Sequence, residues 1–122
     1  MANSADNPFA ALKGQKYLSL ASFRKNGAAV LTPLWFAEQE GKLYVMTRSD
    51  SGKIKRIRNN PRVRVAPCTL RGRVTGPWVE GRARLLPPEE PRARRLLEKK
   101  YLLMRIPWLW SRQNIFLELA PE

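Results

Sequence analysis

The chain has 122 residues, and we expect one domain spanning residues 1–122. With one cysteine, Cys68, and no histidine, it cannot form an internal disulfide, and a zinc site or a histidine-based hydrolase is disfavoured. The 23 Lys and Arg against 10 Asp and Glu give a net charge of +13, which suits an anionic partner: nucleic acid, a membrane surface or a phosphorylated small molecule.

Alternating apolar and polar residues predict six strands. They cover residues 17–23, 28–36, 42–47, 62–69, 77–86 and 114–119. Asn26-Gly27 predicts a hairpin between the first two strands, and residues 38–41 predict the next turn. Gly81 predicts a bulge or a close contact within the fifth strand.

Three helices are predicted between and before these strands: a short one around residues 9–12, one from Ser51 to about Pro61, and one from Pro87 to about Tyr101. Ser51 is a candidate N-cap, and Ile54 and Ile57 share one face. The fold class is therefore mainly β: a six-stranded antiparallel barrel, closed or split, with helices after the third and fifth strands.

No apolar run is long enough to span a bilayer, and residues 1–10 lack the features of a signal peptide. We therefore expect a cytoplasmic protein that does not contact a membrane. Acidic residues are few and scattered, so no pair of catalytic carboxylates is predicted. We predict no catalytic side chain and no metal ligand. If the protein is an enzyme, a cofactor carries the reaction.

The segment from Met46 to Lys53 is the most informative for binding. It leads from a strand end through Thr47 and a polar turn to Ser51, Gly52 and Lys53 at a helix N-terminus. Free backbone N–H groups, a hydroxyl, a glycine and a lysine favour a phosphate or a carboxylate there. An ordinary capped surface helix is the alternative, and the glycine pattern of a P-loop is absent.

Two further segments carry weaker signals. Pro33, between Thr32 and Trp35, cannot donate a ladder hydrogen bond, so it marks an edge, a bulge or a place where a ligand approaches. Arg73 and Trp78 lie in a basic, glycine-containing loop that suits an anionic tail, a ring, or single-stranded nucleic acid. A bulged strand with a core tryptophan and a solvated hairpin are the structural alternatives.

Together these motifs resemble the pyridoxamine-phosphate-oxidase-like split-barrel superfamily, and in particular its small flavin or deazaflavin oxidoreductases, many of which use coenzyme F-420. The matching segments come in family order between Tyr17 and Leu86. They are residues 17–27, 32–36, 46–47, 51–58, 60–63, 66–69, 71–72 and 76–81.

The resemblance implies a Greek-key split barrel that forms a homodimer, with F-420 or FMN bound at the interface. It places Thr32, Pro33 and Trp35 along the cofactor ring, and Met46, Thr47, Ser51, Gly52 and Lys53 near its phosphate. Arg73 and Trp78 are expected near the cofactor tail or the small-molecule substrate. The Arg-rich strand of true pyridoxamine phosphate oxidases is missing, which argues against that reaction. Residues 102–112 match no family motif, so they cap the cleft, join the dimer contact or block the site.

The expected function is hydride transfer between F-420 or FMN and a small organic acceptor. The polyglutamate tail of F-420 favours that cofactor in so basic a chain. Two alternatives stay open: a nucleic-acid-binding barrel without enzymatic activity, which does not explain the ordered motifs, and a cofactor carrier with little turnover.

Overall fold

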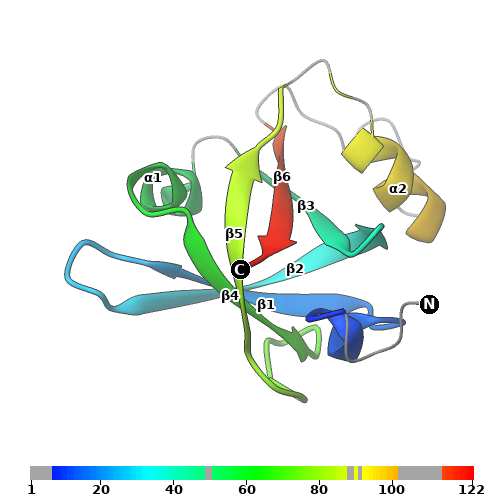
Figure 1. Cartoon of the computed structure of the whole chain (residues 1–122), viewed down its shortest axis with the longest axis horizontal. Coiled ribbons are helices and arrows are strands. Elements are labelled where there is room, and N and C mark those ends of the chain that lie inside the picture. The colour runs from blue at the N-terminus through cyan, green and yellow to red at the C-terminus, as the bar shows by residue number, and fades with distance from the viewer. Residues whose placement is uncertain (1–6, 49–50, 88–89, 91, 102–113) are drawn as a thin grey trace.

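A computed structural model describes residues 7–48, 51–87, 90, 92–101 and 114–122. The strands form one closed antiparallel barrel in the order β1-β2-β3-β6-β5-β4 (Figure 1). The strands are β1 (Tyr17–Phe23), β2 (Ala29–Gln39), β3 (Lys42–Arg48), β4 (Arg62–Cys68), β5 (Val79–Leu85) and β6 (Asn114–Pro121). The predicted six-stranded, mainly β architecture is confirmed.

Helix α1 (Gly52–Asn59) follows β3, and helix α2 (Arg92–Lys100) follows β5, as predicted. A 3-10 turn, Ala10–Leu12, precedes β1 and confirms the short helix expected there. Helix α2 begins at Arg92, later than the predicted start at Pro87. Residues 102–112, whose role was left open, lie outside the described residues.

The barrel interior is filled by alternate side chains of all six strands, as the twofold periodicity of a strand requires. Leu18 and Leu20 of β1, Val45 of β3, Val65 of β4 and Leu117 of β6 are fully buried there. Ile54 and Ile57 of α1 join the same core, so the predicted buried face of this helix is confirmed. Leu12 of the Ala10–Leu12 turn and Phe9, the residue before it, also join this core.

Two tight turns set the strand register. Ala28 N–H donates to Asn26 Oδ1 at 3.0 Å, and Gly27 has a φ of 87°, which confirms the predicted Asn-Gly hairpin. The second turn, predicted over residues 38–41, is shorter than expected. Strand β2 continues to Gln39, and only Glu40 and Gly41 form the turn. Both residues have positive φ, 53° and 78°, the geometry of a two-residue hairpin that matches strand twist.

A close contact explains Gly81 in β5. A Cβ atom there would lie 2.9 Å from the carbonyl oxygen of Ala120 and 3.3 Å from the Phe9 ring. The predicted close contact is therefore confirmed.

Strand β2 has a second strand partner over only part of its length. Strand β2 pairs with β1 from Ala29 to Trp35, but with β3 only from Phe36 to Gln39. Beyond Val45, β3 pairs within the described residues with β6 alone, and α1 begins four residues after β3 ends. Pro33 lies in the part of β2 that has a single partner, which confirms its predicted position at an edge.

Helix α2 covers the outer face of the sheet opposite α1 (Figure 1). Leu97 and Tyr101 pack there with Ala37 of β2, and Ala93 packs with Tyr44 of β3. Within the described residues no helix is long and apolar enough to cross a membrane. The same part of the chain holds no cluster of metal-ligating side chains.

Candidate cofactor-binding site

The end of β3 and the start of α1 bring two hydroxyl groups together. Thr47 Oγ1 lies 3.5 Å from Ser51 Oγ, and Ser51 has the extended backbone of an N-cap residue, with φ −74° and ψ 151°. Its side chain makes no capping bond to the helix. The hydroxyl of Ser51 and the first N–H groups of α1 are thus arranged around the same helix end, where an anion is favoured.

Lys53 is the charged group of this cluster. Only 9% of the residue is exposed, although lysine is almost never buried without a partner. Burial lowers the pKa of its amine, and the neighbouring Arg56 guanidinium lowers that pKa further. No hydrogen bond or ion pair to a described residue compensates it. Such a cation is stabilised when an anion binds beside it.

A second group of predicted residues lies on the outer face of β2. Leu31 is 54% exposed and Pro33 is also exposed. Gly72, with a φ of 89°, approaches the Pro33 ring, since a Cβ on it would lie 3.8 Å from Pro33 Cγ. This contact brings the loop that carries Arg73 to the open part of β2. Thr32 is half-buried and pairs with Leu20 of β1.

Trp35 and Met46 form a third group, beneath α2. Both are partly buried and pack against Ala37, Leu97 and Tyr101. The indole of Trp35 is stacked on the Tyr101 ring, with 4.8 Å between ring centroids and 6° between the planes. One face of the predicted ring-lining tryptophan is therefore covered by its own chain. Trp78, the residue before β5, is 39% exposed.

The predicted residues therefore fall into separate neighbourhoods. Thr47 meets Ser51 just before α1, whose first turn carries Gly52 and Lys53. Pro33 meets the Arg73 loop, and Trp35 packs with Met46 under α2. The cofactor-binding roles of these residues stay predictions.

Two residues with defined roles were missed. Arg56 donates from Nε to Ser22 Oγ at 2.8 Å, which links α1 to β1. The Tyr101 hydroxyl oxygen accepts from Phe36 N–H at 3.1 Å, and its one proton is shared between Phe36 C=O, at 2.8 Å, and Lys16 C=O. Both contacts join segments at least 34 residues apart, and no local pattern indicates them.

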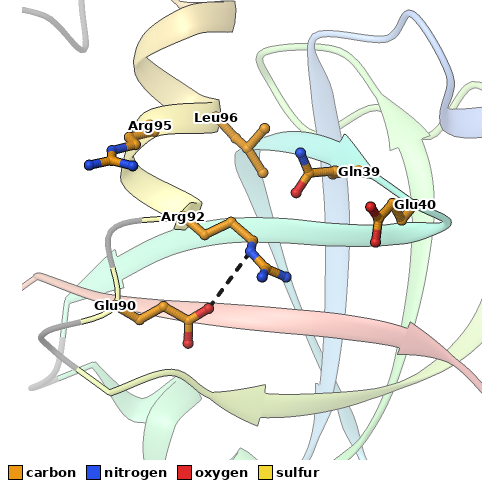
Figure 2. A pocket seen from close by; sticks show the side chains of 6 residues that line it. All are labelled: Gln39, Glu40, Glu90, Arg92, Arg95 and Leu96. Carbon is orange, nitrogen blue, oxygen red and sulfur yellow. Dashed lines mark ion pairs between the residues drawn. The ribbon is translucent and has the colours of Figure 1, made fainter.

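A cavity of about 560 Å³ lies on the other side of the barrel, between α2 and the β2–β3 turn (Figure 2). Its walls carry charges of both signs, from Arg92 and Arg95 of α2, Glu40 of the turn and Glu90. Arg92 points toward the acidic residues, whereas Arg95 points away from them (Figure 2). Arg92 Nε lies 4.0 Å from Glu90 Oε1, so part of this charge is already paired. None of the predicted site residues lines it.

The family comparison supports a single assignment. Residues 6–113 match the family model for pyridoxamine 5'-phosphate oxidase, which is most of the chain. No curated protein has a matching sequence.

Solved structures share the fold at low identity. The haem storage protein HutZ from Vibrio cholerae has a TM-score of 0.74 at 12% identity, over 90% of this chain and 84% of HutZ. A provisionally named pyridoxamine 5'-phosphate oxidase from Listeria innocua has a TM-score of 0.70 at 19% identity, over 98% of this chain and 94% of that one. General stress protein 26 from Bacillus anthracis has a TM-score of 0.67 at 22% identity, over 95% and 87%. The chain belongs to the pyridoxamine 5'-phosphate oxidase family of split barrels.

Proposed function

We propose that the protein is an oxidoreductase that moves a hydride between a phosphate-bearing flavin or deazaflavin, FMN or coenzyme F-420, and a small organic acceptor. The observation that carries this proposal is Lys53 in the first turn of α1, which is 9% exposed and has no hydrogen bond or ion pair to a described residue, two residues after the Ser51 hydroxyl that meets Thr47. A phosphate at this helix end would accept hydrogen bonds from the hydroxyls and pair with the amine. These donors therefore fit the phosphate of either cofactor.

The bound cofactor would supply the hydride chemistry, and this chain would supply position and charge. Lys53, Thr47 and Ser51 would hold the phosphate. The stretch of β2 with one strand partner, around Thr32 and Pro33, leaves backbone groups available to a planar ring. The exposed Arg73 and Trp78 would meet the tail or the substrate.

Haem is the rival cofactor, because two structural neighbours are described as a haem storage protein and a haem-binding protein. Histidine is a common axial ligand of haem iron, and this chain has none. The one cysteine is 6% exposed, and its burial raises the pKa of the thiol, which disfavours the thiolate that would ligate iron. The composition therefore favours a flavin-type cofactor over a haem ligated by histidine or cysteine.

We also propose that two copies of the chain form a homodimer. Leu31 and Leu70 are 54% and 66% exposed, and Leu31 shares the outer face of β2 with Pro33. A stable dimer buries roughly 1,200–2,000 Å² in total, and exposed leucines of this kind are suited to its centre. Light scattering should give the mass of two chains for the wild type and of one chain for Leu31→Lys. A wild-type monomer would contradict this part.

The test of the reaction begins with the reduced cofactor. The protein is mixed with reduced F-420, or with reduced FMN without oxygen, and a panel of small enones, quinones and nitro compounds is added. We expect the oxidised chromophore to reappear faster with the protein than without it, and Lys53→Gln to remove this acceleration. Cofactor binding without any acceleration would indicate a carrier.

A further inference from the structure

A second hollow is lined by residues of α1 and of the β1–β2 hairpin. Figure 1 shows these two elements on the same side of the barrel. Its volume is about 380 Å³. Four of its lining residues are cations: Arg24 and Lys25 from the hairpin, and Lys55 and Arg56 from the helix. None of the lining residues is acidic; the others are Phe23, Gly52 and Asn59.

Arg56 is held in place within this hollow. Its Nε donates to Ser22 Oγ at 2.8 Å, and Ser22 is fully buried. The other side of its guanidinium lies against Gly52, where a Cβ atom would be 2.8 Å from Arg56 Nη1. A glycine at this position therefore leaves the space that the guanidinium occupies. One fixed donor group is thus presented at the first turn of α1.

The charge of this region is poorly compensated. Arg56 is close enough to Lys53 to lower the pKa of the lysine amine. Lys55 and Lys25 are exposed, and no ion pair within the described residues involves any of the four lining cations. Like charges held together without a counter-charge repel each other, and an anion between them removes that repulsion.

The geometry points to a second anion-binding site in this hollow, in which Arg56 is the fixed ligand and Arg24, Lys25 and Lys55 are adaptable ones, for a phosphate or carboxylate group of a small ligand. Lys53 does not line the hollow, so the two anion positions differ in their cations, although Gly52 belongs to both. If the proposed function is correct, the cofactor or substrate carries anionic groups at two places. Anion binding by the hollow does not depend on that function.

The experiment measures binding of inorganic pyrophosphate by calorimetry at low ionic strength. We expect saturable binding to the wild-type protein, weakened by about tenfold or more in Arg56→Gln, since a charge-assisted guanidinium contact is lost. Gly52→Ala leaves the net charge unchanged but displaces the guanidinium, and should weaken binding several-fold. Arg58→Gln, which removes one exposed charge from the same helix outside the hollow, should leave the affinity within about twofold.

Three results would overturn the site. The first is an equal loss of pyrophosphate affinity in Arg56→Gln and Arg58→Gln, which indicates that the anion responds to the overall positive charge of the helix and not to a specific site. The second is unchanged affinity in Gly52→Ala and Arg56→Gln with loss only in Lys53→Gln, which indicates a single anion position. The third is binding of a single-stranded oligonucleotide without binding of pyrophosphate. Pyrophosphate binding that depends on Arg56, in a protein that binds neither FMN nor F-420, would support this site and refute the proposed function.

Discussion

The indole of Trp35 and the ring of Tyr101 are stacked almost in parallel, 4.8 Å apart and inclined by 6°. Tyr101 follows α2 directly, whereas Trp35 lies in β2, at the last position that pairs with β1. The Tyr101 hydroxyl accepts from the N–H of Phe36, the next residue along β2, and shares its proton between the carbonyl groups of Phe36 and of Lys16, the residue before β1. The tyrosine thus completes the β1–β2 seam where the strand ladder ends, and fixes α2 to the barrel.

Tyr101→Phe should destabilise the barrel by about 1–3 kcal/mol, because it leaves buried backbone groups of Phe36 without their partner. Urea unfolding measures the free energy. Tyr17→Phe is the matched control, since the Tyr17 hydroxyl has no hydrogen bond to a described residue, and its cost should stay within about 0.5 kcal/mol. Equal costs for the two variants would show that the seam does not depend on the Tyr101 hydroxyl.

The same hydroxyl predicts a dependence on alkaline pH. Burial raises the pKa of Tyr101 to about 12. The hydrogen bond with the Phe36 backbone lowers this pKa, but by less than burial raises it. Because the pKa is higher in the folded protein than in the unfolded chain, where it is about 10, the protonated hydroxyl stabilises the fold fully below pH 10. This stabilisation is lost as the pH rises toward 12. The difference in unfolding free energy between wild type and Tyr101→Phe should therefore shrink between pH 10 and pH 12. A constant difference over that range would contradict this assignment.

Lys53 should weaken the ligand-free barrel. Its pKa is lowered by burial and by Arg56, so the charged form is disfavoured in the folded state. Lys53→Met should raise the melting temperature by about 2–4 °C at neutral pH, and the gain should decline as the pH rises into the range where the lysine itself loses its proton. The same variant should lose anion binding at the α1 end. A melting temperature of Lys53→Met below that of the wild type would mean that the folded protein stabilises the charged amine of Lys53.

Glu118 of β6 is the one acidic residue that is buried as a whole among the described residues, with 8% of its side chain exposed. It accepts from Tyr44 at 3.2 Å and pairs with Arg84 at 3.2 Å and Lys42 at 3.7 Å. Glu118→Gln should cost about 1–2 kcal/mol, since both cations are half-exposed and can be solvated instead. Glu80→Gln, at the exposed pair with Arg64, should change stability by less than about 0.5 kcal/mol in the same assay. Equal losses of unfolding free energy in Glu118→Gln and Glu80→Gln would show that burial does not strengthen the interactions of Glu118.

The strands and both long helices were predictable because their signals are local. Alternation identifies β1 and β4, and Asn26-Gly27 fixes the first hairpin through backbone conformation. The end of β2 was placed too early, since Glu38 and Gln39 are as polar as turn residues and only pairing with Leu43 and Lys42 makes them strand.

The candidate site was predictable only in part. Thr47 and Ser51 are four residues apart, at the end of a strand and the start of a helix, so their contact follows from the local sequence. The stacking of Trp35 on Tyr101 and the bond from Arg56 to Ser22 depend on the closed barrel and on the position of α2, which residue patterns do not contain. The family resemblance was confirmed for the fold and the family, while the roles carried over to single residues stay predictions.

Fluorescence titration of the purified protein with FMN and with F-420 tests the central claim most directly. The account predicts a saturable change with at least one of them, at one cofactor per chain, and loss of that change in Lys53→Gln but not in Arg58→Gln. A signal that saturates with neither cofactor, or that saturates equally well in Lys53→Gln, would contradict it.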